Sequence, residues 1–73
     1  MPLLVDYASR YAFLRIAAFT IVAEQGVHAL SRPALASRLG TSTTSIRRIL
    51  ASDIDLRELA IQEADERRRR GRW

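Results

Sequence analysis

Apolar residues recur at helical spacing in four stretches of this 73-residue chain, and short runs of glycine and small polar residues separate them. The longest stretch predicts a helix over residues 6–25, which ends at Gly26, a residue typical of helix C-termini. Its apolar side follows a three-and-four spacing through Tyr7, Tyr11, Leu14, Ala18, Ile21 and Val22. We therefore expect this helix to turn one face towards the core.

Two short helices are predicted next, joined by a tight turn. Ser31 can cap the first of them, residues 33–39, because its side-chain oxygen can accept an unpaired backbone N–H. Pro33 fits the first turn of that helix, where its missing N–H has no cost. Ser42 can cap the second short helix, residues 43–50, in the same way.

A fourth helix is predicted over residues 53–70, with Ser52 as its cap and Asp55 three residues later in the arrangement of a capping box. Leucine, isoleucine and alanine dominate the apolar residues, while the chain has only three glycines and two prolines, a composition that favours helices. The expected fold class is all-α. We expect one domain over residues 1–73, built as a small bundle of about four helices.

Composition excludes several classes of function. The chain has no cysteine and one histidine, His28, so we expect no disulfide, no metal site and no cofactor. It also lacks a nucleophile–base pair and a phosphate-binding glycine loop, so we do not expect an enzyme. No apolar run approaches the roughly 18 residues of a membrane span, and the N-terminus is unlike a secretory signal. A cytoplasmic protein is the expectation.

Charge is divided into blocks along the chain, and every cation is an arginine. Residues 7–52 carry six arginines and one acid, residues 53–66 carry six acids and one arginine, and residues 67–73 add five arginines. A basic middle beside an acidic helix indicates that one face is suited to an anion. The run from Arg67 to Arg72 has three interpretations: a mobile tail that adds phosphate contacts, the end of the fourth helix, or a product of truncation.

The segment from Pro33 to Leu50 has the layout of a helix-turn-helix, with Gly40 in the turn and the small Ala36 where two helices would cross. In this motif the second helix enters the major groove of double-stranded DNA. The predicted contacts to base edges come from Thr43, Thr44, Ser45 and Arg48. The predicted contacts to the DNA backbone come from Ser31, Ser42 and Arg47.

Four other arginines allow more than one interpretation. Arg32 and Arg38 flank the first short helix, and either contact phosphate or remain in ion pairs or solvent. Arg10 and Arg15 are expected to be surface residues of the long helix.

Three short runs carry a more specific pattern. Residues 17–26 contain a double alanine and a closing glycine, Ser31 lies four residues before Leu35, and residues 39–42 read Leu-Gly-Thr-Ser. These runs, with Leu56 in the fourth helix, resemble the N-terminal domain of tetracycline-repressor-like (TetR-like) transcriptional regulators. The resemblance extends from residue 14 to residue 61, or 48 of the 73 residues.

The chain departs from the family at three positions. Arg47 stands where the family usually has tyrosine, Leu50 where it has an aromatic residue, and Asp53 where a lysine contacts phosphate. Arg47 can replace the phosphate contact of the tyrosine, whereas Asp53 would repel phosphate.

The resemblance implies sequence-specific binding of double-stranded DNA by a bacterial transcriptional regulator, usually a repressor, that is nucleoid-associated when bound. The C-terminal half of the family, which binds inducers and forms the dimer, has no counterpart in 73 residues. We therefore expect a monomer or weak homodimer without an inducer response, or one part of a longer parent chain. A different interpretation is a protein-interaction module or self-associating bundle that uses the exposed face of the fourth helix.

Overall fold

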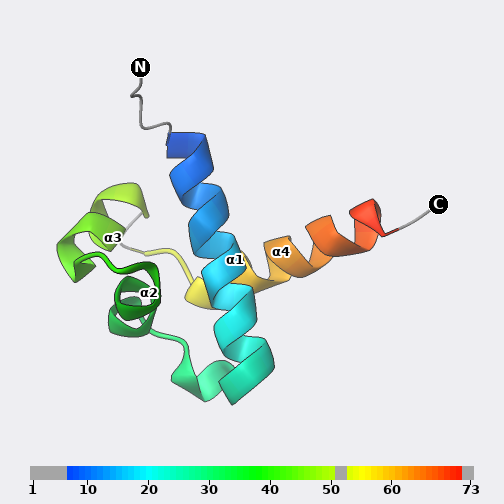
Figure 1. Ribbon diagram of the computed structural model, residues 1–73, viewed down its shortest axis with the longest axis horizontal. Coiled ribbons are helices and arrows are strands. Elements are labelled where there is room, and N and C mark those ends of the chain that lie inside the picture. Colours follow the sequence, from blue (N-terminus) through cyan, green and yellow to red (C-terminus); the bar gives the residue numbers. More distant parts are fainter. Residues whose placement is uncertain (1–6, 51–52, 72–73) are drawn as a thin grey trace.

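The computed structural model describes residues 7–50 and 53–71, which form helices joined by short connections (Figure 1). The helices are α1 (Tyr7–Gln25), the short 3-10 helix η1 (Val27–Ala29), α2 (Arg32–Leu39), α3 (Thr43–Ile49) and α4 (Leu56–Arg70). The described residues contain no strand, which confirms the all-α fold class and the small helical bundle. None of these helices combines the length and the apolar character needed to cross a membrane.

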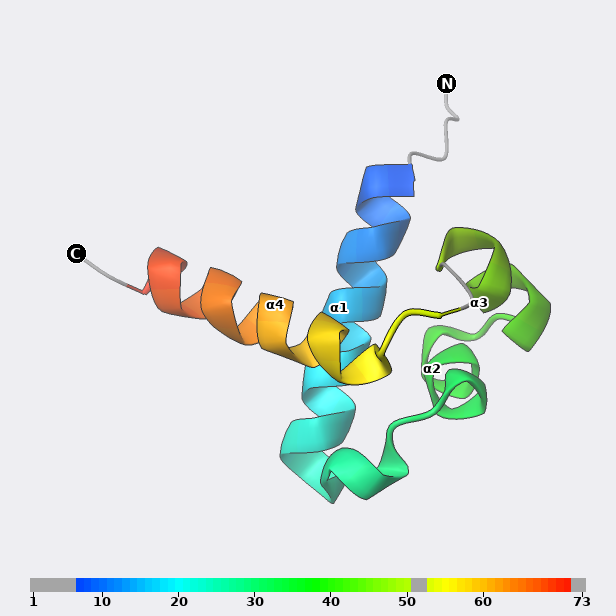
Figure 2. The ribbon, with the colours of Figure 1, turned by 180° about the vertical axis from the view of Figure 1, so that it is seen from behind.

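Helix α1 lies at the centre of the bundle. α2 and α3 pack on one side of α1, whereas α4 crosses α1 and its C-terminal end extends away from them (Figure 1 and Figure 2). All four α-helices contribute to one buried apolar core, which consists of Leu14, Ala17, Ala18, Ile21, Leu35, Ala36, Ile46, Leu50 and Leu59. Each fully buried leucine or isoleucine contributes about 1.5–3 kcal/mol, so this core fixes α2 and α3 against α1.

The boundaries of the two short helices differ from the predicted ones by a single residue. α2 begins at Arg32 instead of residue 33, and α3 ends at Ile49 instead of residue 50. Ser31 caps α2, since its Oγ accepts the N–H of Ala34 at 3.1 Å. Asp6, the predicted first residue of the long helix, lies outside the described residues.

The predicted start of the fourth helix is wrong. α4 begins at Leu56, and Asp55, not Ser52, is its N-cap. The Asp55 carboxylate accepts the backbone N–H of Arg57 at 3.0 Å and pairs with its guanidinium at 2.8 Å. Aspartate is among the strongest N-caps, and the extended backbone at Asp55 (φ −84°, ψ 118°) lets it cap the helix from this position. Ser52 itself lies outside the described residues.

A buried carboxylate joins α1 to the C-terminal half of α4. Glu63 is 1% exposed, and its carboxylate lies 3.0 Å from Arg67 Nε, 3.5 Å from Arg70 Nη2 and 3.7 Å from Arg15 Nε. The Arg67 guanidinium also lies over the Phe19 ring, 4.4 Å from its centroid. Arginines from both helices thus compensate one buried charge. We call Glu63 and its three arginines the Glu63 cluster.

Candidate nucleic-acid interface

The turn between α2 and α3 is fixed by its backbone. Gly40 has a positive φ of 68°, a left-handed conformation that suits glycine and ends α2. The N–H of Thr41 then donates to the carbonyl of Ala36 at 2.9 Å. Since only residues 40–42 separate the two helices, the direction of α3 relative to α2 is closely constrained.

Ser42 begins α3 and the core holds its inner side. The Oγ of Ser42 accepts the N–H of Ser45 at 3.1 Å and donates to the Oγ of Ser45, also at 3.1 Å. Ile46 is completely buried in the core, and Leu50 just beyond the helix is 4% exposed. α3 therefore has one side anchored in the core and the opposite side directed to solvent. A helix about 10–12 Å in diameter fits a major groove about 12 Å wide.

The solvent side of α3 is basic and hydroxylated. Thr44, Arg47 and Arg48 are exposed on it, because steps of three and four residues return to the same side of a helix. Thr43 and Ser45 are half-buried on its two flanks. α3 contains no acidic residue, and within the described part of the chain neither Arg47 nor Arg48 takes part in an ion pair.

Arginines outside α3 are largely paired with acids. Arg38 forms a two-pronged contact with Glu24 of α1, at 3.0 and 3.3 Å. The prediction for Arg38, which allowed either a phosphate contact or an ion pair, therefore resolves to an ion pair in this structure. The Glu63 cluster accounts for three more arginines. Among the described arginines, the two of α3 therefore lack the carboxylate partners that Arg38 and the arginines of the Glu63 cluster have.

The arginines of α4 are paired with carboxylates of α4 and of its N-cap. The surface pairs are Arg57–Asp55, Arg68–Asp65 and Arg69–Glu66. Hydrogen bonds from Arg57 and Arg69 hold the pKa values of Asp55 and Glu66, respectively, below their usual range. Residues 67–70 form the last turn of α4, in agreement with the interpretation of the arginine run as a helix end. Arg72 lies outside the described residues.

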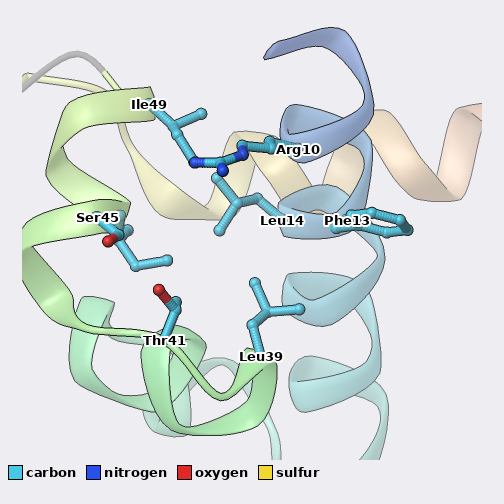
Figure 3. Close-up of a pocket in the computed structure, with 8 residues that line it drawn as sticks. Arg10, Phe13, Leu14, Leu39, Thr41, Ser45 and Ile49 are labelled. Atoms are coloured by element: carbon cyan, nitrogen blue, oxygen red, sulfur yellow. The ribbon is translucent and has the colours of Figure 1, made fainter. Parts of the chain in front are cut away.

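A groove separates the N-terminal half of α1 from α3 (Figure 3). It has a volume of about 270 Å³ and is lined by Arg10, Phe13, Leu14, Leu39, Thr41, Ser45, Ile46 and Ile49. The Arg10 side chain extends from α1 across this groove towards Ile49 (Figure 3). Arg10 is exposed and forms no ion pair with the described residues, so it adds a third uncompensated guanidinium beside α3.

The sequence predicts that Arg10 is exposed but not that it belongs with α3. The helical spacing does indicate this position, because Arg10 lies four residues before the buried Leu14 and therefore on the side of α1 that faces the core and α3. Arg15 also has a role that the sequence does not predict, since it contacts the buried Glu63.

The structure brings together only some of the residues predicted to contact DNA. Thr44, Arg47 and Arg48 share the exposed side of α3, next to the exposed Ser42. Ser45 lies on the flank that lines the groove with Arg10 and its hydroxyl is bonded to Ser42, so it is turned away from the side that carries Arg47.

Two further predicted contacts lie apart from α3. Ser31 and Arg32 are at the opposite end of α2 from the turn, about 12 Å away along an eight-residue helix. The Ser31 oxygen already accepts a hydrogen bond as the cap of α2, although its hydroxyl proton can still be donated. His28 lies in η1 and is exposed.

Comparison of the chain with models of protein families, with curated proteins and with solved structures finds no match. The resemblance to TetR-like regulators therefore stays a prediction from the sequence. Within residues 7–50 and 53–71, no three histidine, cysteine, aspartate or glutamate side chains are grouped to hold a metal ion. The most distinctive surface of the described chain is the uncompensated basic side of α3.

Proposed function

We propose that this protein binds double-stranded DNA sequence-specifically, with α3 in the major groove. The observation that carries the proposal is the pair Arg47 and Arg48. Both are exposed on a short helix without acids, while the arginines of α4 and the Glu63 cluster have carboxylate partners. A charge that is left without a partner on a protruding, anchored helix is suited to a polyanion.

The arrangement of α3 divides the contacts between bases and backbone. Arg48 and Thr44 lie about 40° apart around the helix axis, so both can reach base edges from the centre of the exposed side. Arg47 lies about 60° from Thr44 in the other direction and is suited to a phosphate at the groove wall. Arg10, across the groove on the Ser45 flank, is suited to the phosphates of the opposite wall.

Transcriptional regulation, usually repression, is the role that the resemblance to TetR-like proteins supports. A protein that occupies a site in the major groove can exclude other proteins from the same DNA. The bacterial cytoplasm, with association to the nucleoid when bound, is the compartment in which this proposed role would be exercised.

A charge-matched pair of variants tests the proposal. Arg47→Gln/Arg48→Gln and Arg68→Gln/Arg69→Gln each remove two exposed positive charges, but only the first pair lies on α3. We expect the α3 variant to lose binding to labelled random-sequence duplex DNA in fluorescence anisotropy titrations, while the α4 variant keeps it. Equal losses would show that binding follows net charge alone, and retention by the α3 variant would refute the proposal.

The salt dependence gives a second readout of the same titrations. If Arg10 and Arg47 each neutralise one phosphate while Arg48 contacts a base edge, the slope of log K against log salt should be about −2, and the α3 variant should reduce its magnitude by about 1. Deleting residues 67–73 would be an unsuitable control, because Arg67 and Arg70 compensate the buried Glu63.

A further inference from the structure

Helix α1 has a second apolar stripe on the side away from the core. Ala12, Ile16, Phe19 and Ala23 recur at steps of four, three and four residues, on the face opposite Leu14. Ile16 is 40% exposed. An apolar stripe on a helix is normally covered by a neighbouring element, yet Ile16 and Ala23 of this stripe are exposed.

Helix α4 extends this apolar surface. Ala60, Ile61 and Ala64 line a shallow hollow of about 260 Å³ together with Phe19, Val22 and Ala23 of α1. Ile61 is 52% exposed, among the most exposed large apolar side chains of the described chain. We call the combined surface the outer apolar face; it consists of Ile16, Phe19, Val22, Ala23, Ile61 and Ala64. α4, which carries Ile61 and Ala64 of this face, and α3 lie on different sides of α1 (Figure 2).

The charges of α4 indicate which occupant suits this face. Residues 53–66 carry six acids and one arginine, whereas residues 67–70 are four arginines in succession. Arg67 and Arg70 are directed to the buried Glu63, so the exposed charges that flank Ile61 on its side of α4 are Arg57, Glu58, Asp65 and Arg68. If two copies of α4 lie antiparallel about a two-fold axis at Ile61, position 57 of one copy lies opposite position 65 of the other. Arg57 of each copy then faces Asp65 of the other copy.

We propose that the outer apolar face is the interface of a homodimer in which the two α4 helices pair antiparallel about Ile61. The face is apolar at its centre and self-complementary in charge at both ends, as a two-fold interface between identical chains requires. Arg57 and Asp65 have partners on their own helix, Asp55 and Arg68, but exposed pairs of this kind are weak and exchange readily. The dimer leaves both α3 helices exposed, and it does not depend on whether they bind DNA.

Sedimentation velocity of the full chain, from about 10 µM to about 1 mM and without DNA, tests the association. We expect a concentration-dependent dimer that Ile61→Glu weakens by more than about tenfold, because it brings two carboxylates together at the axis. Val27→Glu is the matched control, since Val27 is 42% exposed but lies in η1, outside the outer apolar face. Far-UV circular dichroism checks that both variants keep their helices.

A charge exchange tests the antiparallel geometry. Arg57→Glu and Asp65→Arg should each weaken the dimer by about tenfold, because each places like charges opposite one another across the axis. The double variant Arg57→Glu/Asp65→Arg should restore the dimer. In it, a glutamate at position 57 of one copy faces an arginine at position 65 of the other, so the facing charges are again opposite. A double variant as weak as the single ones would overturn the antiparallel arrangement. A chain that stays monomeric at all concentrations would overturn the homodimer.

Discussion

The Glu63 cluster predicts that replacing one of its arginines destabilises the protein more than replacing the glutamate. Glu63 is 2% exposed at its side chain, whereas Arg15, Arg67 and Arg70 are 25%, 45% and 61% exposed. A buried carboxylate that loses a cation has no access to water, while an arginine that loses its carboxylate can be hydrated. Replacement of a whole buried ion pair by apolar side chains of similar volume is often close to neutral, and here the arginines that Glu63→Met leaves behind are partly exposed and can be hydrated.

The contacts of Arg67 determine how far the free energy of unfolding should fall. Arg67→Ala removes a charge-assisted hydrogen bond of 3.0 Å, worth about 1.5 kcal/mol at a half-exposed site, and a cation–π contact with Phe19, worth about 0.5 kcal/mol. The free energy of unfolding should therefore fall by about 2 kcal/mol. Glu63→Met should change it by less than about 1 kcal/mol, because methionine fills a similar volume and favours helices.

A double-mutant cycle separates these contributions. In the Glu63→Met background, Arg67→Ala should lower the free energy of unfolding by only about 0.5 kcal/mol, which gives a coupling of about 1.5 kcal/mol. Urea unfolding followed by circular dichroism at neutral pH measures each variant. This account is wrong if Glu63→Met lowers the free energy of unfolding as much as Arg67→Ala, or if the double variant loses the sum of the two single losses.

Substitutions at four further positions test the caps, the turn and the groove. Ser31→Ala removes the acceptor for the Ala34 N–H and should cost about 1 kcal/mol in urea unfolding, whereas Ser31→Asp should not. Gly40→Ala should also lower the free energy of unfolding by about 1 kcal/mol. The loss should come from the positive φ alone, because beyond the neighbouring residues of the chain no atom lies within 4 Å of the added methyl group. An unchanged free energy of unfolding would contradict the left-handed turn. The hydrogen bond from Arg57 lowers the pKa of Asp55 in the folded protein. The ionised Asp55 therefore stabilises the fold above about pH 4, and this stabilisation is lost as the pH falls through the pKa of Asp55 in the folded protein. Asp55→Asn should be less stable than the natural chain at pH 7 and equal to it in strong acid. Arg10→Gln should weaken DNA binding and reduce the salt slope by about 1 without changing stability, and an unchanged slope would remove Arg10 from the interface.

The sequence predicts the parts of the fold that depend on local chemistry. Gly40 and the caps Ser31 and Ser42 act on the backbone within three residues, so their effect can be read without knowing the tertiary structure. η1 is not predicted, because three residues are too few for an apolar period. The start of α4 is misplaced because Ser52 and Asp55 are both good caps, and sequence alone does not show which of them the fold uses.

The parts that sequence does not predict depend on which helix faces meet. Glu63 lies in a run of charged residues and looks solvent-exposed, yet it follows Leu56 and Leu59 by seven and four residues and shares their inward side. The same applies to Ser45, which the motif assigns to the DNA side and the structure turns towards the groove beside Arg10. The helical spacing places Glu63 on the inward side of α4, but only the packing of α4 on α1 shows that Arg15 comes close enough to pair with it.

The exposed side of α3 is the surface that we propose contacts DNA. Nuclear magnetic resonance of the isotope-labelled chain, titrated with a short duplex, tests it residue by residue. We predict that the amide shifts which change most lie between Ser42 and Arg48, with smaller changes near Arg10 and none around Ile61. Changes confined to residues 67–70, or no changes at concentrations where the chain remains folded, would contradict the account.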